Sequence, residues 1–385
     1  MSYFCNFHQE KERLIKLNII LKSLLTGFAL PCLSAMGMPK KFRTERFRKE
    51  TPIALKFDKD GKFRILHLTD IHQVMPEMDD EEDKIIPAAN DIETQNVIET
   101  LVEKTNPDLV VFGGDNVSGY WKEFNYELIR QTIEKITYPI RKRNIPLCVV
   151  FGNHDAEEGF HLEFQMMMYH EYADCRSSFN DADVYGCGNC CVTIKSSKAD
   201  KDAFALWLID SNDYQKNGYD CVHDDQIDWY ESRAQELKTA NDGKPLPAIL
   251  FQHICPQQML DGYKEVTADD EYTFERDGRY FFFNHKILEG RIRETPCPPC
   301  MDNDHRRQFE SWKKTGDIIA AFFGHDHVND FKINIDGIDL YQTLGAGYFT
   351  YGLERGGRLI ILDENNPKNI ETESIEVNKI TQIDV

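Results

Sequence analysis

The chain has 385 residues, enough for a large hydrophobic core in two domains or in one large α/β domain with insertions. Its hydrophobic content of 41% and aromatic content of 11% are typical of soluble globular proteins. The 45 Lys and Arg against 65 Asp and Glu give a net charge of −20, which argues against a general basic surface for nucleic acid or anionic membranes. A phosphate-handling site remains compatible with this charge, because bound divalent metal ions reverse the local electrostatics.

The N-terminal segment allows two interpretations. Positive charge at residues 11–16 is followed by a broken apolar stretch over residues 17–36, which resembles a signal peptide or a weak anchor. Alternatively, translation starts at Met36 or Met38 and the preceding residues are upstream sequence. We expect a cytoplasmic protein, with secretion or membrane anchoring through residues 1–36 as the alternative.

The cysteine pattern leaves a second question open. Eleven cysteines are an odd number, so at least one thiol is outside any internal disulfide. Two C-x-x-C pairs, Cys187 with Cys190 and Cys297 with Cys300, are compatible with a structural zinc site or with disulfides. The long separation between the pairs is unlike a zinc ribbon, and the Pro-Pro inside the second pair is a turn signal without any metal.

Five apolar runs are each followed closely by residues of the types that can bind metal ions or protons. These runs are predicted as β-strands over residues 64–69, 109–112, 147–151, 248–251 and 318–323. The polar residues that follow them are, in chain order, Asp70 and His72, Asp115, Asn153 and His154, His253, and His325 and His327. Amphipathic helices are expected over residues 91–104 and 124–143. Because the carboxyl ends of parallel strands meet at one edge of a sheet, we expect these side chains to converge.

Each of these residues also has an ordinary structural interpretation. An aspartate after a strand often forms a turn, Asn153 tolerates a left-handed turn, and a single buried histidine such as His253 is usually hydrogen-bonded in a core. The pair His325 and His327 is weak evidence alone, although residues two apart in an extended segment point to the same side. Five such sets in one chain are poorly explained by chance.

The order Asp-x-His, Gly-Asp, Gly-Asn-His-Asp, His and Gly-His-x-His resembles the signature of the calcineurin-like metallophosphoesterase family over residues 64–362. The stretches 209–214, 324–331 and 345–348 are further similar to the purple acid phosphatase-like branch of plants. One position departs from the purple enzymes, because Ser118 stands where they carry a metal-binding tyrosine, and His72 replaces that ligand. We therefore expect no tyrosinate absorption band.

The resemblance implies a four-layer αββα sandwich of two mixed β-sheets, the metallophosphoesterase fold. The catalytic domain would span residues 64–363, after a possible signal or anchor segment at 1–37 and a basic segment at 38–63. Residues 364–385 would be a polar peripheral tail. The long aromatic-rich stretch 261–314 would form a lid or substrate-recognition insertion.

The resemblance also implies a site with two divalent or trivalent metal ions. Carried over by position, Asp70, His72 and His327 would hold the first metal, Asn153, His253 and His325 the second, and Asp115 would bridge them. Such a bridge holds two cations roughly 3.5–4 Å apart with a nucleophilic hydroxide between them. Oxygen and nitrogen ligands suit Mn, Fe, Zn or Co. His154 would act as a general acid or a transition-state stabiliser beside the leaving group.

The expected activity is metal-dependent hydrolysis of phosphate mono- or diesters in a small phosphorylated substrate or a phosphoprotein. The net charge disfavours nucleic acid as a partner, and membrane contact is expected only if residues 17–36 act as an anchor. One alternative is a catalytically silent metal-binding protein on the same fold. Another is a thiol or zinc-structural protein centred on the two C-x-x-C pairs.

Overall fold

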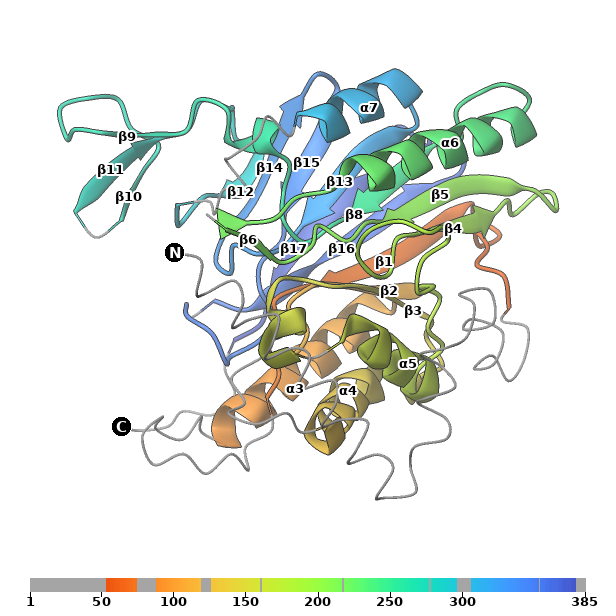
Figure 1. Ribbon diagram of the computed structural model, residues 1–385, viewed down its shortest axis with the longest axis horizontal. Helices are drawn as coiled ribbons and strands as arrows, with labels where there is room; N and C mark the ends of the chain where they lie inside the picture. Colours follow the sequence, from red (N-terminus) through yellow and green to blue (C-terminus); the bar gives the residue numbers. More distant parts are fainter. Residues whose placement is uncertain are drawn as a thin grey trace, which may run out of the picture. The chain divides into compact units, whose positions relative to one another are not determined.

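Two β-sheets lie face to face between two layers of helices (Figure 1). The computed structural model describes residues 53–74, 88–118, 126–159, 161–216, 218–276, 278–295, 306–352 and 354–378. The predicted signal or anchor segment therefore lies outside the described residues. Among the helices that are described, none combines the length and the apolar character that a membrane crossing requires.

The first large sheet has five strands in the order β17-β16-β1-β2-β3. Its strands are β1 (Lys62–Leu68), β2 (Leu109–Gly113), β3 (Leu147–Val150), β16 (Gly356–Asp363) and β17 (Glu371–Glu376). The strands β1, β2 and β3 are parallel, whereas β16 runs antiparallel to β1. Strand β17 comes from the predicted peripheral tail and forms an edge of the sheet beside β16.

The second large sheet has seven strands in the order β12-β14-β15-β13-β8-β5-β4. Its strands are β4 (Cys190–Lys195), β5 (Asp202–Leu208), β8 (Ala248–Phe251), β12 (Glu289–Arg291), β13 (Ile318–Phe323), β14 (Asp330–Ile335) and β15 (Ile338–Gln342). Four neighbouring strands, β15, β13, β8 and β5, are parallel. A hairpin at Asp336 and Gly337 joins β14 to β15, with φ values of 50° and 88° at the turn, as a two-residue hairpin turn requires.

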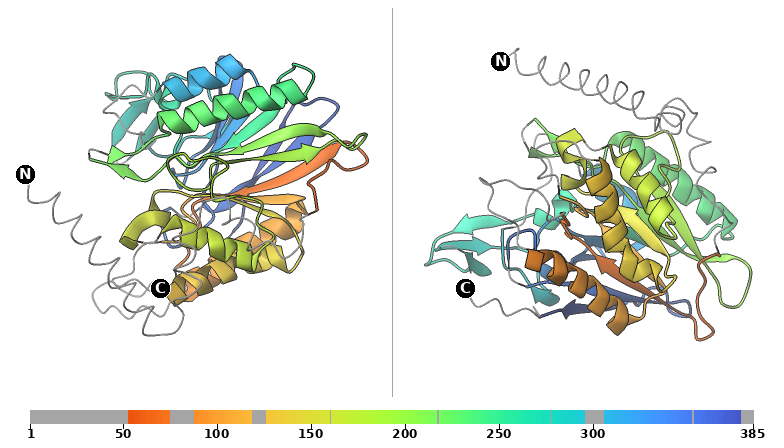
Figure 2. Two further views of the ribbon diagram at one scale, coloured as in Figure 1. Left: turned by 45° about the vertical axis from the view of Figure 1, so that its right-hand side comes forward. Right: turned by 90° about the horizontal axis from the view of Figure 1, so that it is seen from below.

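Helices cover the outer face of each sheet (Figure 2). Those on the five-stranded sheet are α3 (Ala88–Thr105), α4 (Tyr126–Arg141) and α5 (Leu162–Tyr172). Those on the seven-stranded sheet are α6 (Asp224–Ala240) and α7 (Arg307–Thr315). The described residues also include two short 3-10 helices. The helix η2 (His154–Gly159) follows β3, and η3 (Gln257–Leu260) follows β8.

Alternate strand residues fill different layers, because successive side chains point to opposite faces of a sheet. In β1, Leu66 packs with the helices, while Ile65 packs between the two sheets. In β13, Phe323 packs toward α6 and α7, while Phe322 packs between the sheets. The resulting three buried clusters are the three interfaces of a four-layer αββα sandwich, which confirms the predicted fold.

The predicted insertion over residues 261–314 contains a small sheet of its own. This sheet has the order β10-β11-β9, from β9 (Lys264–Val266), β10 (Phe274–Arg276) and β11 (Arg279–Phe282). In Figure 1 it extends outward from the seven-stranded sheet, and Phe281 connects it to the core beneath α6 and α7. A further hairpin is formed by β6 (Tyr214–Gln215) and β7 (Gly218–Tyr219). Whether the insertion acts as a lid stays a prediction.

Replacement of Phe322 by alanine is expected to lower the free energy of unfolding by about 3–5 kcal/mol. The ring is fully buried between the sheets and stacks on Phe251 and Tyr341, with centroid separations of 5.4 and 4.7 Å. The hydrogen-bonded sheets cannot close over the cavity that the smaller side chain leaves. Urea denaturation followed by tryptophan fluorescence measures the loss. Leu288→Ala, at a side chain that is 47% exposed, is the control, and an equal loss in both variants would contradict this inter-sheet packing.

Candidate metal centre

The predicted site residues lie at the carboxyl ends of strands from both large sheets. Strands β1, β2 and β3 are followed by Asp70 and His72, by Asp115, and by Asn153 and His154. Strands β8 and β13 of the other sheet are followed by His253 and by His325 and His327. All of these side chains are buried except that of His154, which is 25% exposed. The centre is therefore enclosed where the ends of the two sheets meet.

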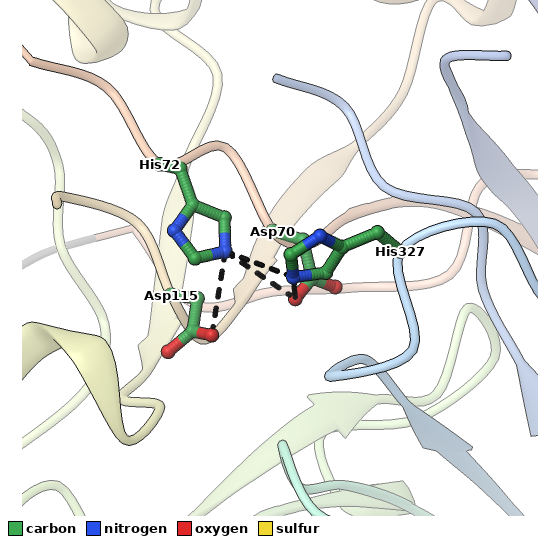
Figure 3. Close-up of side chains that lie close together, drawn as sticks. All are labelled: Asp70, His72, Asp115 and His327. Atoms are coloured by element: carbon green, nitrogen blue, oxygen red, sulfur yellow. Dashed lines mark hydrogen bonds and ion pairs between the residues drawn. The ribbon is translucent and has the colours of Figure 1, made fainter. Parts of the chain in front are cut away.

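A first group of four residues brings its ligand atoms within 4.8 Å of one another (Figure 3). The group consists of Asp70, His72, Asp115 and His327. The Nε2 atom of His72 lies 3.4 Å from Oδ2 of Asp115, 3.9 Å from Oδ1 of Asp70 and 3.2 Å from Nε2 of His327. Two carboxylates and two imidazoles thus face a common point, the arrangement that a divalent cation requires.

A second group shares Asp115 with the first and adds His253 and His325. The Nε2 atom of His253 lies 3.1 Å from Oδ2 of Asp115. Asn153, in the loop that follows β3, is also fully buried. Within the described part of the chain, neither Oδ1 of Asn153 nor Nε2 of His325 has a hydrogen-bond partner. Buried acceptors without a partner are costly, so these atoms fit the role of ligands to a cation.

Backbone hydrogen bonds tie the ligand-bearing loops to one another across the two sheets. The backbone N–H of His72 donates to the carbonyl oxygen of Asp115 at 2.8 Å. From the other sheet, the N–H of His325 lies 3.1 Å from both carboxylate oxygens of Asp70. The N–H of Gly347, in the segment that links β15 to β16, donates to the carbonyl oxygen of Asp70 at 3.0 Å. The position of Asp70 therefore depends on both sheets.

Four of the predicted ligands have left-handed backbone conformations. The φ values are 51° at Asp70, 45° at His72, 51° at Asp115 and 76° at His325. This conformation costs on the order of 1–2 kcal/mol for each residue with a side chain. Such strain is concentrated at functional sites, where the surrounding structure maintains it.

Two glycines of the sequence motifs leave room for the ligands. A Cβ atom at Gly152 would lie 2.3 Å from Oδ1 of Asp115, and one at Gly324 would lie 1.9 Å from Oγ1 of Thr69 and 2.8 Å from Oδ2 of Asp70. Any larger residue would displace the carboxylates. The glycines of the Gly-Asn-His-Asp and Gly-His-x-His motifs are thus required by close approach rather than by a turn alone.

Burial keeps three of the histidines neutral. Removal from water lowers the pKa of His72 and of His325 well below its usual value, and that of His327 to about 3. Neutral imidazole is the form that binds metal ions. These residues are therefore ready to act as ligands without losing a proton at neutral pH.

The charges of the two carboxylates are only partly balanced by protein groups. Burial raises the pKa of Asp70 to about 7. Burial also opposes ionisation of Asp115, but the neighbouring His253 outweighs it and holds the pKa of Asp115 well below the usual range. In return, Asp115 overcomes the effect of burial on His253 and raises the pKa of that imidazole to about 10. A bound cation would take the place of the proton on His253.

His154 is held beside both groups by the start of η2. Its backbone N–H donates to Oδ1 of Asp115 at 2.8 Å, and its ring centroid lies 5.0 Å from that of His72. Its Nδ1 atom lies 2.9 Å from Oε1 of Glu157. Burial alone would lower the pKa of His154, but Glu157 and Asp115 outweigh it and raise the pKa to about 9.

Several residues around the centre were not predicted from the sequence. The hydroxyl of Thr350 lies 2.5 Å from Nδ1 of His327, and the ring of Tyr351 stacks on that of His327 at 4.3 Å. Tyr219 meets the ring of His325 edge to face, also at 4.3 Å. Tyr214 contacts Asn153, and it belongs to the stretch 209–214 that carries the branch resemblance, although no role was predicted for it. The others carry no motif that would have revealed them.

Two further predictions concern Ser118 and the two C-x-x-C pairs. Ser118 is buried, and its backbone N–H donates to the carbonyl oxygen of Gln73, the residue after His72. Cys187 and Cys190 are buried in different clusters, while Cys297 and Cys300 lie outside the described residues. The groups of potential metal ligands found in the described ranges contain no cysteine. The zinc alternative for the complete C-x-x-C set stays untested.

Replacement of Asp155 by alanine is expected to destabilise the metal-free protein by at least about 3 kcal/mol. Its buried carboxylate accepts hydrogen bonds from the N–H groups of Gly152, Asn116 and Val117 at 2.8, 3.0 and 3.0 Å, and so joins the loops after β2 and β3. The variant leaves these donors without partners. Urea denaturation measures the change in the free energy of unfolding.

Asp228→Ala is the control for this variant, because that carboxylate is exposed and pairs with Arg307 on the surface. We expect the control to lose less than about 1 kcal/mol. Equal losses in the two variants would show that Asp155 does not hold the loops together.

Comparison with known proteins identifies a matching family model and several related sequences. The family model for the calcineurin-like phosphoesterases matches residues 63–329. The chain is 27% identical over 315 residues to "Probable inactive purple acid phosphatase 14" of Arabidopsis thaliana, covering 77% of this chain and 74% of that protein. It is 26% identical over 376 residues to "Probable inactive purple acid phosphatase 29" of the same plant, covering 91% of this chain and 87% of that protein.

A fungal relative and a solved structure were also found. The chain is 28% identical over 336 residues to "Phosphatase DCR2" of Saccharomyces cerevisiae, covering 81% of this chain and 53% of that protein. A dimetal phosphatase from Danio rerio superposes with a TM-score of 0.47 at 10% identity, covering 82% of this chain and 99% of that one. Because the family model spans more than half of the chain, the protein belongs to the calcineurin-like phosphoesterase family.

Proposed function

We propose that this protein is a dinuclear metal-dependent phosphoesterase that hydrolyses phosphate mono- or diesters. The observation that carries the proposal is the position of Asp115, whose carboxylate belongs to two groups of buried ligand atoms at once. A carboxylate shared between two such groups is the geometry of a metal-bridging ligand. The orphaned acceptors of Asn153 and His325 support a cation in the second group.

In this proposal the seven buried residues divide between two metals. Asp70, His72 and His327 hold the first metal, Asn153, His253 and His325 hold the second, and Asp115 bridges them. When bound, the metal ions supply an activated water and neutralise the charge of the phosphate group. The oxygen and nitrogen donors suit Mn, Fe or Zn.

The charge of the ligand set bears on the choice of metals. A tyrosinate ligand would add one negative charge, whereas His72 is neutral because of its burial. The two carboxylates Asp70 and Asp115 carry two negative charges, whereas a ligand set with an additional phenolate would carry three. The centre therefore neutralises less positive charge on the metal ions. This favours two divalent ions over a pair that contains ferric iron.

His154 is the proposed general acid. Its ring is partly exposed, unlike the ligands, and lies beside His72 and Asp115 without belonging to either group of ligand atoms. An imidazole placed there donates a proton to the departing oxygen of the ester. General acid catalysis of this kind contributes about 10²–10⁴-fold to the rate.

The substrate class and the compartment are also part of the proposal. A net charge of −20 favours small phosphorylated molecules or phosphoproteins over nucleic acid. We place the protein in the cytoplasm, with secretion or anchoring through residues 1–36 as the alternative.

A catalytically silent metal-binding protein is the second candidate. The word "inactive" in the names of the two plant relatives favours it. The complete set of potential metal ligands and the presence of His154 beside it favour catalysis. Hydrolysis of p-nitrophenyl phosphate by the metal-loaded protein, abolished by a chelator and restored by metal, separates the two candidates.

We expect the wild-type protein to bind two metal ions, and His325→Ala and His327→Ala each to retain one. The two histidines belong to different groups of ligand atoms, so each substitution removes a ligand of a different metal. Elemental analysis after dialysis gives the stoichiometry, and the double variant is expected to retain none. His161→Ala, at a partly exposed histidine before α5, is the control. Loss of both metals in each single variant would contradict the division.

Replacement of His154 by alanine is expected to lower kcat for an alkyl phosphate by about 10²–10⁴-fold while both metal ions remain bound. The substitution removes the proposed acid but none of the ligands. Steady-state kinetics and elemental analysis of the same sample test this, again with His161→Ala as the control. Unchanged turnover with full metal content would exclude the acid role.

A further inference from the structure

A chain of two hydrogen bonds and one ion-pair contact connects a proposed ligand of the second metal to the proposed acid. The amide Nδ2 of Asn153 donates to the hydroxyl of Tyr214 at 2.9 Å. That hydroxyl donates to Oε1 of Glu157 at 3.0 Å, and the same oxygen lies 2.9 Å from Nδ1 of His154. One carboxylate oxygen of Glu157 therefore contacts both the tyrosine hydroxyl and the imidazole.

We propose that Tyr214 and Glu157 are positioning residues, Tyr214 for the metal-binding oxygen of Asn153 and Glu157 for the ring of His154. The role of Glu157 rests on the proposed function, because it requires His154 to act on a substrate. The role of Tyr214 requires only that Asn153 binds a metal ion.

The donors and acceptors permit a single arrangement of the network. A tyrosine hydroxyl has one hydrogen, and Glu157 as a carboxylate can only accept, so the hydroxyl donates to Glu157 and accepts from Asn153. The amide nitrogen of Asn153 is thereby held at Tyr214, and its Oδ1 is left buried without a partner. The carboxylate of Glu157, 2.9 Å from Nδ1 of His154, favours a proton on that nitrogen, and Nε2 is then the atom that can meet a substrate.

The loop before Tyr214 holds the tyrosine in place. The carboxylate of Asp210 accepts hydrogen bonds from the N–H groups of Cys187 at 2.7 Å and Asn212 at 2.8 Å. Asn212 has a φ of 66°, and its side-chain amide donates to the carbonyl oxygen of Cys221 at 2.7 Å. These hydrogen bonds fix the conformation of residues 209–214, none of which is a proposed metal ligand or the proposed acid.

The hairpin that follows completes the support. Strands β6 and β7 pair through Tyr214 with Tyr219 and Gln215 with Gly218. The rings of Tyr214 and Tyr219 stack with their centroids 5.5 Å apart, and Tyr219 in turn contacts the ring of His325. The hairpin thus brings one tyrosine to each of two proposed ligands of the second metal, Asn153 and His325.

Removal of the hydroxyl with Tyr214→Phe is expected to weaken binding of the second metal ion by about 10–100-fold, the usual effect of losing a hydrogen bond to a ligand. Isothermal titration calorimetry of the metal-free protein with Mn²⁺ measures the affinity for the second metal ion without any turnover. Tyr185→Phe is the matched control, because it removes the hydroxyl of another half-exposed tyrosine outside the network. Equal affinities of Tyr214→Phe and the wild type would overturn the role of Tyr214.

The role of Glu157 is tested with two substrates of similar shape, phenyl phosphate and p-nitrophenyl phosphate. Phenoxide is the more basic leaving group and depends more on a correctly placed acid. For Glu157→Ala we expect kcat to fall at least about 10-fold with phenyl phosphate but less than about 3-fold with p-nitrophenyl phosphate, with KM and metal content unchanged. Glu157→Gln keeps one acceptor oxygen and is expected to recover part of the loss.

The control for Glu157 is Glu163→Gln, which removes an exposed carboxylate in the first turn of α5. An equal loss of kcat with both substrates would show a merely structural effect and overturn the role of Glu157. Absence of hydrolysis by the wild-type protein would refute the proposed function, and with it the role of Glu157. The metal affinity of Tyr214→Phe would still decide the role of Tyr214.

Discussion

Two carboxylates buried where the sheets meet, those of Asp70 and Asp115, impose the constraint on which the structure of the centre depends. Both are fully enclosed, and a buried ion costs several kcal/mol unless it is paired. The protein itself compensates only in part, through a proton kept on His253 and a raised pKa of Asp70. Cations between the carboxylates and the neutral imidazoles would complete the compensation, which connects the electrostatics of the fold to its proposed chemistry.

The backbone around these carboxylates is strained, and the rest of the fold maintains the strain. Asp70, His72, Asp115 and His325 all have positive φ values. Their loops belong to different sheets but are hydrogen-bonded to one another. The cost of the left-handed conformations is therefore offset by packing between the sheets, where Phe322 and its neighbours are buried. The geometry of the centre and the stability of the inter-sheet core are parts of one structure.

The absence of the tyrosine ligand leaves no gap in the first group of ligand atoms. The backbone N–H of Ser118 donates to the carbonyl oxygen of Gln73, and the first group still contains four residues, with His72 3.4 Å from Asp115. In the proposed centre, His72 would be a neutral ligand in place of an anionic one, and the number of ligands would stay the same. On this proposal, the difference from the purple enzymes would concern the charge and colour of the metal centre rather than its number of ligands.

The sequence alone determined the five strands that lead to the centre, the family, the αββα fold and the residues that gather at the centre. It could do so because apolar runs followed by Asp, Asn or His form a local pattern that repeats in order along the chain. It could not assign the hydrogen bonds that orient these residues. Tyr214 and Glu157 are 57 positions apart, and His72 and His327 are 255 positions apart, and no local pattern relates such pairs. Only the tertiary structure, by bringing the ends of two sheets and one hairpin together, decided which side chains hold the ligands in place.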